Sequence, residues 1–169
     1  MAIISSEIQF RLSGGASNSA PGSSIGGTKS STSITTATLN NLWDNVSGDE
    51  AAAGDTEYRC VYLHNANATL TWEQVTVWIS ANTPAAGTTC EIGLGAAAVN
   101  ATETAVANEG VAPAGVTFSA PTSKAGGLLI GDIPAGQAKA IWIKRVVTAG
   151  AAAYNADSVV IQAEGDSAS

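Results

Sequence analysis

The sequence is poor in charged and aromatic residues, and its few charges are mainly acidic. Charged residues make up 12% of the 169 positions, aromatic residues make up 5%, and the formal net charge is −7. No run of lysine or arginine occurs. Nucleic-acid binding requires basic residues that neutralise phosphates, and anionic membrane surfaces attract the same residues. The composition therefore argues against nucleic-acid partners and against anionic membranes.

Long apolar runs are also missing from the sequence. No segment approaches the roughly 20 apolar residues of a transmembrane helix. The start, MAIISSEIQFRLSGG, lacks the basic residues and the apolar core of a secretory signal. We therefore expect the chain to fold in a cytoplasm, where thiols stay reduced. Cys60 and Cys90 are predicted to be free thiols, with Cys60 buried, and they lack the CxxC spacing of a metal site.

No arrangement of residues typical of a catalytic site is evident. His64 is the only histidine, and no GxSxG motif accompanies it. The acidic residues between positions 44 and 57 lack the alternate spacing of a calcium loop, which favours a solvated acidic loop. Glu103 and Glu109 could form a carboxylate pair for glycoside hydrolysis, but their Ala-rich surroundings give no support. The sequence thus predicts no enzyme, cofactor or metal; a hydrolase with an unrecognised site is the weakest alternative.

What the sequence does contain is a series of short β-like runs. Apolar residues alternate with small or polar ones between turn-forming residues, and about seven such runs predict an all-β sandwich. The runs are EYRCVYLHN, TLTWEQVTVWIS, TTCEIGLGAA, GVTFSAP, GGLLIGDIPAG, AKAIWIKRVV and DSVVIQAEG. In the second run a bulge near Glu73-Gln74 would place Trp72 on the same face as Val75 and Val77. In IPAGQAKAIWIK a hairpin turn is expected at Pro134 and Gly136.

Two segments before residue 56 differ from this pattern. Residues 1–35 contain a strand-like run followed by a Gly/Ser-rich stretch that cannot fold alone, which predicts an extended N-terminal arm. The sandwich domain would then comprise residues 36–169. Leu39, Leu42, Trp43 and Val46 have helical spacing, so we expect a short helical turn near residues 39–46.

Two tryptophans stand at positions that face away from the predicted core residues of their strands. Trp78 alternates with Val77 and Ile79, and Trp142 alternates with Ile141 and Ile143, so both rings would point away from the core. We interpret them as interface residues, because tryptophan is enriched in interface hot spots. Together with Ile8 and Phe10 of the arm they form the predicted interface set. The alternative is a three-layer core in which the chain itself buries both faces, for example beneath the arm.

Several segments resemble small virion structural proteins of tailed bacteriophages. They are GDEAAAGDTEYRCVYLHN, VAPAGVTFSAP and IGDIPAGQAKAIWIKRVVTAGAAAYNADSVVIQAEG, within roughly residues 45–165. The resemblance implies an immunoglobulin-like or jelly-roll-like β-sandwich. It also implies a capsid decoration, or cement, protein that binds the major capsid protein on the virion surface and catalyses nothing.

On this basis we expect a homo-oligomer, a dimer or trimer, that is made in the host cytoplasm and stabilises a capsid surface. The alternative is an accessory component of the phage tail or baseplate, with carbohydrate binding in host attachment as one role. The sequence does not distinguish a capsid location from a tail location.

Overall fold

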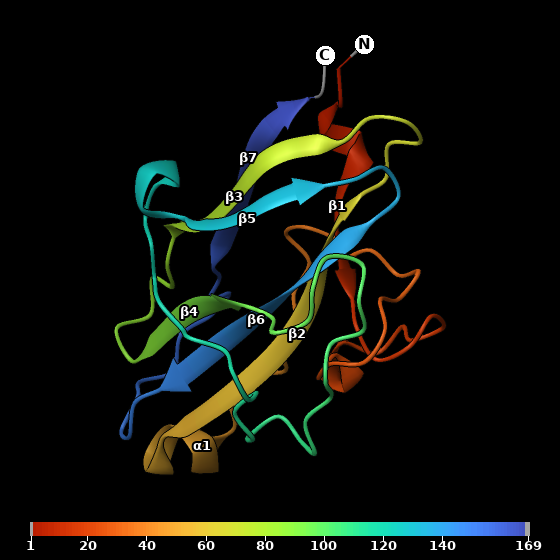
Figure 1. Ribbon diagram of the computed structural model, residues 1–169. Coiled ribbons are helices and arrows are strands. Elements are labelled where there is room, and N and C mark those ends of the chain that lie inside the picture. Colours follow the sequence, from red (N-terminus) through yellow and green to blue (C-terminus); the bar gives the residue numbers. More distant parts are fainter. Residues whose placement is uncertain (1, 168–169) are drawn as a thin grey trace.

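The computed structural model describes residues 2–167, which form two antiparallel β-sheets and one short α-helix, α1 (Gly48–Ala53) (Figure 1). One sheet has four strands in the order β1-β2-β6-β4, and the other has three in the order β5-β3-β7. The strands are β1 (Ile8–Leu12), β2 (Asp55–Asn65), β3 (Trp72–Ala81), β4 (Thr88–Leu94), β5 (Leu128–Ile133), β6 (Ala138–Val147) and β7 (Val160–Ser167). The predicted all-β sandwich is confirmed. Its immunoglobulin-like or jelly-roll-like type stays a prediction, and residues 1, 168 and 169 of the predicted domains lie outside the described residues.

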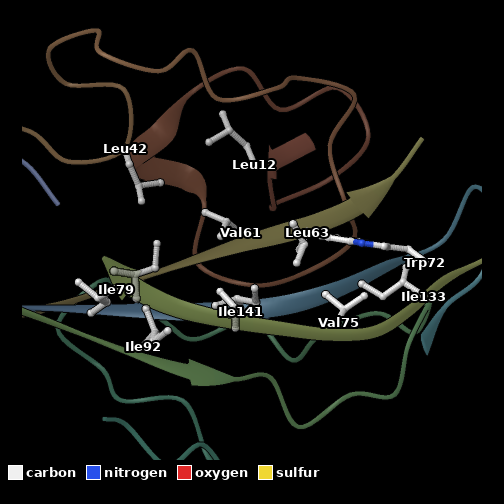
Figure 2. Packing of buried hydrophobic residues seen from close by; sticks show 12 residues of the cluster. Leu12, Leu42, Val61, Leu63, Trp72, Val75, Ile79, Ile92, Ile133 and Ile141 are labelled. Carbon is white, nitrogen blue, oxygen red and sulfur yellow. The ribbon is translucent and has the colours of Figure 1, made fainter. Parts of the chain in front are cut away.

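The main core lies between the two sheets (Figure 2). Val61 and Ile141 of the four-stranded sheet are fully buried there, as are Val75 and Ile133 of the three-stranded sheet. They are the alternate apolar residues of their strands, because successive side chains of a strand point to opposite faces. Each such side chain contributes about 1.5–3 kcal/mol when it is fully removed from water.

The predicted bulge in β3 is confirmed. The register of β3 with β5 shifts between Trp72 and Val75, and Gln74 has a φ of 52°. The extra residue brings Trp72, which is 4% exposed, into the core with Val75 and Val77. Trp72 stands at an even position and Val75 and Val77 stand at odd ones, so without the bulge they would point to opposite faces of the strand. With it they share one face.

A second core covers the outer face of the four-stranded sheet. Its buried members are Cys60, Tyr62, Ala138, Ala140 and Trp142, and Val106, Val116 and Phe118 of the β4–β5 connection pack against them. The N-terminal segment closes the edge of this layer, because Cys60 N–H donates to the Ser24 carbonyl (2.6 Å) and Val106 N–H to that of Ile25 (2.9 Å). The molecule thus has three layers, namely loops, the four-stranded sheet and the three-stranded sheet.

The prediction that Trp142 faces a partner is therefore wrong. Its side chain is 0% exposed in the single chain, because the β4–β5 connection covers it. Trp78 does point away from the main core, but it is only 8% exposed. The three-layer alternative describes Trp142 correctly.

The N-terminal segment also differs from the predicted extended arm. β1 pairs with β2 from Ile8 opposite Asn65 to Leu12 opposite Val61, so it is an edge strand of the sandwich. Ile8 and Phe10 pack half-buried against the main core instead of forming an exposed interface. Residues 30–34 fold back onto β1, with Leu12 N–H donating to the Thr32 carbonyl (3.0 Å). The Gly/Ser-rich stretch is ordered because it hydrogen-bonds to this strand and covers the sheet.

Two further local predictions are wrong. GVTFSAP forms no strand and contributes only a bridge between Ser119 and Ile92. The turn at Pro134 and Gly136 is present, with Gln137 N–H donating to the Pro134 carbonyl (3.0 Å), but it joins β5 of one sheet to β6 of the other. It is therefore a crossover between layers and not a hairpin.

The two cysteines are free, as predicted, and both are buried, although burial was predicted only for Cys60. Burial raises the pKa of each thiol, Cys60 and Cys90, to about 12. Such thiols are unreactive near neutral pH because the thiolate is the nucleophile. Separately, none of the helices within residues 2–167 has the length and apolar character needed to cross a membrane.

Candidate functional site

The core face of the four-stranded sheet changes from apolar to charged toward the α1 end of β2. Glu57 and Arg59 follow the same alternation as the core residue Val61, and Glu57 lies directly opposite Arg145 of β6. Glu57, Arg59 and Arg145 are 2%, 1% and 7% exposed. Charged side chains are seldom this buried unless they are paired. This end of the sheet therefore holds a buried group of charged side chains.

Trp43 lies at the centre of these charges. The guanidinium carbons of Arg59 and Arg145 lie 5.0 and 4.8 Å from the centroid of its ring. Cation–π contacts of this kind contribute about 0.5–2 kcal/mol each, depending on desolvation. Arg59 also donates from Nε to the Leu42 carbonyl (3.3 Å), and Arg145 donates from Nη1 to the Asp44 carbonyl (2.9 Å).

These two hydrogen bonds explain why the predicted helical turn at residues 39–46 is wrong. The carbonyl groups of Leu42 and Asp44 accept from arginines of the sheet, so the backbone around them is irregular and α1 begins only at Gly48. Ser47 caps that helix through a hydrogen bond from Glu50 N–H (3.2 Å). Leu39 of the predicted apolar face is 73% exposed.

Three carboxylates complete the group, which we call the Trp43 cluster: Trp43, Asp44, Glu57, Arg59, Glu109 and Arg145. Arg145 Nε donates to Glu57 Oε2 (2.6 Å), and Arg145 Nη2 lies 3.5 Å from Asp44 Oδ1. Arg59 forms an ion pair with Glu109. Burial raises the pKa of Glu57, and Arg145 opposes that shift. The prediction of a solvated acidic loop is therefore wrong for Glu57.

The cluster is an ion-pair network and not an evident metal site. Single oxygens of Asp44, Glu57 and Glu109 lie within 4.8 Å of one another, which would suit a cation. Arg59 and Arg145 already pair with these carboxylates, so two positive charges offset three negative ones. A metal ion would have to displace buried guanidinium groups, which is costly because they would remain desolvated and unpaired.

A pocket of about 520 Å³, which we call the Trp43 pocket, opens beside the cluster. Trp43 and Arg59 form part of its wall, and polar groups of Asn40, Asn108 and Glu109 line it as well. Its volume falls within the roughly 300–1,000 Å³ of small-molecule sites. An aromatic wall with amides and carboxylates can bind a polar ligand through hydrogen bonds.

The other titratable residues that the sequence singled out have structural positions. His64 is 6% exposed at the end of β2, with Nε2 3.1 Å from the Gly136 carbonyl oxygen. Glu103 is 3% exposed and accepts hydrogen bonds from the backbone N–H groups of Ala97 (3.0 Å) and Thr104 (3.2 Å). Glu103 and Glu109 therefore hold different segments and do not act as a carboxylate pair.

The predicted interface residues are not brought together either. Ile8 and Phe10 contact the main core, whereas Trp142 lies in the second core on the other side of the four-stranded sheet. Sequence reasoning missed Trp43, Arg59 and Arg145 as a group. A usable signal existed, because Glu57 and Arg59 stand at core positions of their strand.

Within residues 2–167, the outer face of the three-stranded sheet is only partly covered, and Thr76 and Trp78 of its central strand are 7% and 8% exposed. Leu129 lies opposite Thr76, Gln162 opposite Trp78 and Val160 opposite Ala81. Leu129 and Val160 are 58% and 46% exposed. Lys124 and Glu164 form an ion pair (2.6 Å) on the same face. We call this surface the outer strip: Thr76, Trp78, Leu129, Val160, Gln162 and Glu164.

Comparisons with protein-family models, with curated proteins and with solved structures found no match to this chain. Its function has to be argued from the two surfaces described above. The Trp43 pocket is concave and polar, and the outer strip is partly apolar and partly exposed.

Proposed function

We propose that this protein is a non-catalytic structural component of a tailed-phage virion that binds the major capsid protein and stabilises the capsid surface. Two points support the proposal: the resemblance of segments within residues 45–165 to small virion proteins, and the outer strip. The strip is the observation on which the proposal mainly depends. Leu129 and Val160 are exposed apolar residues of one sheet face, on the two strands that flank β3, and we infer that this face is the contact surface.

The anchors of this proposal differ from those that the sequence suggested. Trp142 is fully buried in the chain, so Leu129 and Val160, with the edge of Trp78 between their strands, take its place. A standard protein interface buries about 1,600 Å² in total and depends on a few such anchors. A dimer or trimer of the chain would bridge neighbouring coat subunits, and repetition over the particle adds avidity.

The test is binding to particles that lack the protein. Leu129→Lys places a charge in the strip and is expected to weaken binding tenfold or more, which corresponds to about 1.4 kcal/mol or more. Wild-type protein should raise the melting temperature of the particles, and moderate salt should not remove it, because the contact is apolar.

Leu39→Lys is the matched control, since Leu39 is 73% exposed in the irregular segment before α1 and lies outside the strip. It should bind within about twofold of wild type, a difference of less than about 0.5 kcal/mol. Equal melting of particles with and without the protein would exclude the stabilising role. Equal weakening by both substitutions would exclude the strip as the contact.

A second candidate, a carbohydrate-binding component of the tail or baseplate, is favoured by the Trp43 pocket. Sugar hydroxyls could donate to Glu109 and Asp44 and exchange hydrogen bonds with Asn108, while Trp43 supplies an apolar wall. Saturation-transfer NMR with a panel of oligosaccharides tests it. Asn108→Ala is expected to abolish the transfer, and Gln162→Ala on the outer strip should leave it unchanged. Absence of transfer from the wild-type protein to every saccharide removes this candidate.

A further inference from the structure

Three of the seven basic side chains have no acidic partner within residues 2–167. Four form ion pairs, namely Arg59, Lys124, Lys144 and Arg145. Lys139 donates from Nζ to the backbone carbonyl of Gly95 (2.8 Å). Arg11 and Lys29 remain, and in a chain of net charge −7 their position together calls for an explanation.

Lys29 lines a small pocket on the outer face of the four-stranded sheet, and Arg11 lies nearby on β1. Arg11 of β1 lies directly opposite Tyr62 of β2, and Tyr62 and Lys29 both line a pocket of about 200 Å³. Arg11 is held in place because its Nε and Nη2 donate to Gln9 Oε1 (2.9 and 2.7 Å). The remaining polar side chains of the lining are Thr28, Asn100 and Thr102.

A second, independent observation near this pocket is the buried side chain of His64. It lies opposite both Gln9 and Ala138, and Ala138 lines the pocket. Its Nε2 is 3.1 Å from the Gly136 carbonyl oxygen, while its buried Nδ1 has no hydrogen-bond partner within residues 2–167. Buried polar atoms without partners are rare in native proteins and often have a functional explanation.

We propose that this pocket binds a small oxyanion, phosphate or sulfate, either free or as the terminal group of a larger ligand. Arg11 and Lys29 would supply the charge, and charge-assisted hydrogen bonds to such an anion are about twice as strong as neutral ones. Thr28, Asn100 and Thr102 offer further donors. The volume is smaller than the roughly 300–1,000 Å³ typical of whole organic ligands, which suits a single anionic group.

The carboxylates on neighbouring segments do not already neutralise the two cations. Glu7 accepts from Asn67 Nδ2 (2.9 Å) and from Ile4 N–H (3.0 Å). Glu103 accepts from the backbone N–H groups of Ala97 and Thr104. Neither forms an ion pair with Arg11 or Lys29 among the described residues.

His64 links anion binding to pH. Burial, with Lys29 and Arg11 nearby, lowers the pKa of His64 to about 4, whereas its contact with the Gly136 carbonyl acts in the opposite direction. An anion beside the two cations offsets their repulsion of a protonated imidazole, so binding raises the pKa of His64. By linkage, the anion binds more tightly as the pH falls toward that pKa. Protonation also gives Nδ1 a hydrogen to donate.

The chain has one histidine, so its imidazole resonance in NMR reports on this site alone. We expect sulfate, which does not titrate in this range, to shift the resonance at pH 5 more than chloride does at equal ionic strength. We also expect the affinity to rise between pH 7 and pH 5. Phenyl phosphate distinguishes the two sources: binding at least tenfold tighter than sulfate indicates the terminal group of a larger ligand, and similar affinity indicates the free ion.

Arg11→Gln and Lys29→Gln are each expected to weaken sulfate binding at least tenfold. Lys124→Gln removes the same charge from the segment before β5, where Lys124 pairs with Glu164, and should change binding less than twofold. The proposal is overturned if sulfate moves the wild-type resonance no more than chloride, or if Lys124→Gln weakens binding as much as the two pocket variants. The wild-type titration decides the matter even if a variant fails to fold.

Discussion

Replacement of Arg145 by methionine is expected to lower the free energy of unfolding by about 3–5 kcal/mol. The substitution removes the partner of Glu57, which is 2% exposed and accepts a hydrogen bond from Arg145 Nε (2.6 Å). A buried carboxylate without its partner keeps its desolvation penalty and loses the offsetting attraction. The change also removes a cation–π contact with Trp43 and the hydrogen bond to the Asp44 carbonyl. Urea unfolding measures the difference.

The cost of Arg145→Met should depend on pH. Burial already raises the pKa of Glu57, and loss of Arg145, which opposes that shift, raises it further. A group with a raised folded-state pKa destabilises the fold as the pH rises above its unfolded value, so protonation of Glu57 relieves the cost. The difference between variant and wild type is therefore expected to shrink as the pH is lowered from neutral toward 5.

Lys144→Met is the matched control, one residue earlier on β6. Lys144 pairs with Glu91 at 2.9 Å, but its side chain is 26% exposed, so the loss should be below about 1 kcal/mol. Glu57→Gln combined with Arg145→Met should recover part of the lost stability, since no buried charge is then left unpaired. Equal effects of the two single substitutions would show that the Glu57–Arg145 pair is not buried as described.

Trp142→Ala is expected to destabilise the isolated chain by about 3–5 kcal/mol. The indole is 0% exposed and packs in the second core with Cys60, Tyr62 and Ala140. Its removal leaves a cavity between the sheet and the β4–β5 connection, and a cavity adds to the lost transfer free energy. Thermal or urea unfolding of a proven monomer gives the value.

Tyr154→Ala provides the comparison, because Tyr154 is also aromatic but 53% exposed. Substitutions on the surface usually stay within about 0.5 kcal/mol. If Trp142→Ala had an equally small effect in the monomer and weakened only an assembly, the interface interpretation of Trp142 would hold after all.

Features set by neighbouring residues could be predicted from the sequence. The all-β class follows from alternation in the strands, and the bulge in β3 follows from the parity change between Trp72 and Val75. The free thiols follow from the expected compartment. Each of these depends on a few adjacent residues or on composition.

The cover of the four-stranded sheet could not be predicted. An apolar residue on the second face of a strand looks the same whether a partner or a distant loop buries it. The loops that cover Trp142 are rich in Gly, Ala, Ser and Asn, and their few anchors, such as Val106 and Val116, carry no periodic pattern.

The conformation of the candidate site could not be predicted from local sequence either. The helical spacing of Leu39, Leu42 and Trp43 is real, but arginines 17 and 101 residues away bind the carbonyls of Leu42 and Asp44. Tertiary contacts of this kind override local helix propensity. Only the placement of Glu57 and Arg59 at core positions indicated that a charged group would assemble there.

The most direct test of this account concerns its claim that the chain alone closes the second face of the four-stranded sheet. Indole N–H exchange with deuterium can be followed by NMR for all four tryptophans of the wild-type protein, in a sample shown to be monomeric. The account predicts slow exchange for Trp142, whose Nε1 is buried. Exchange of the Trp142 indole at the rate of a free indole would show that this face is open in the monomer and would contradict the account.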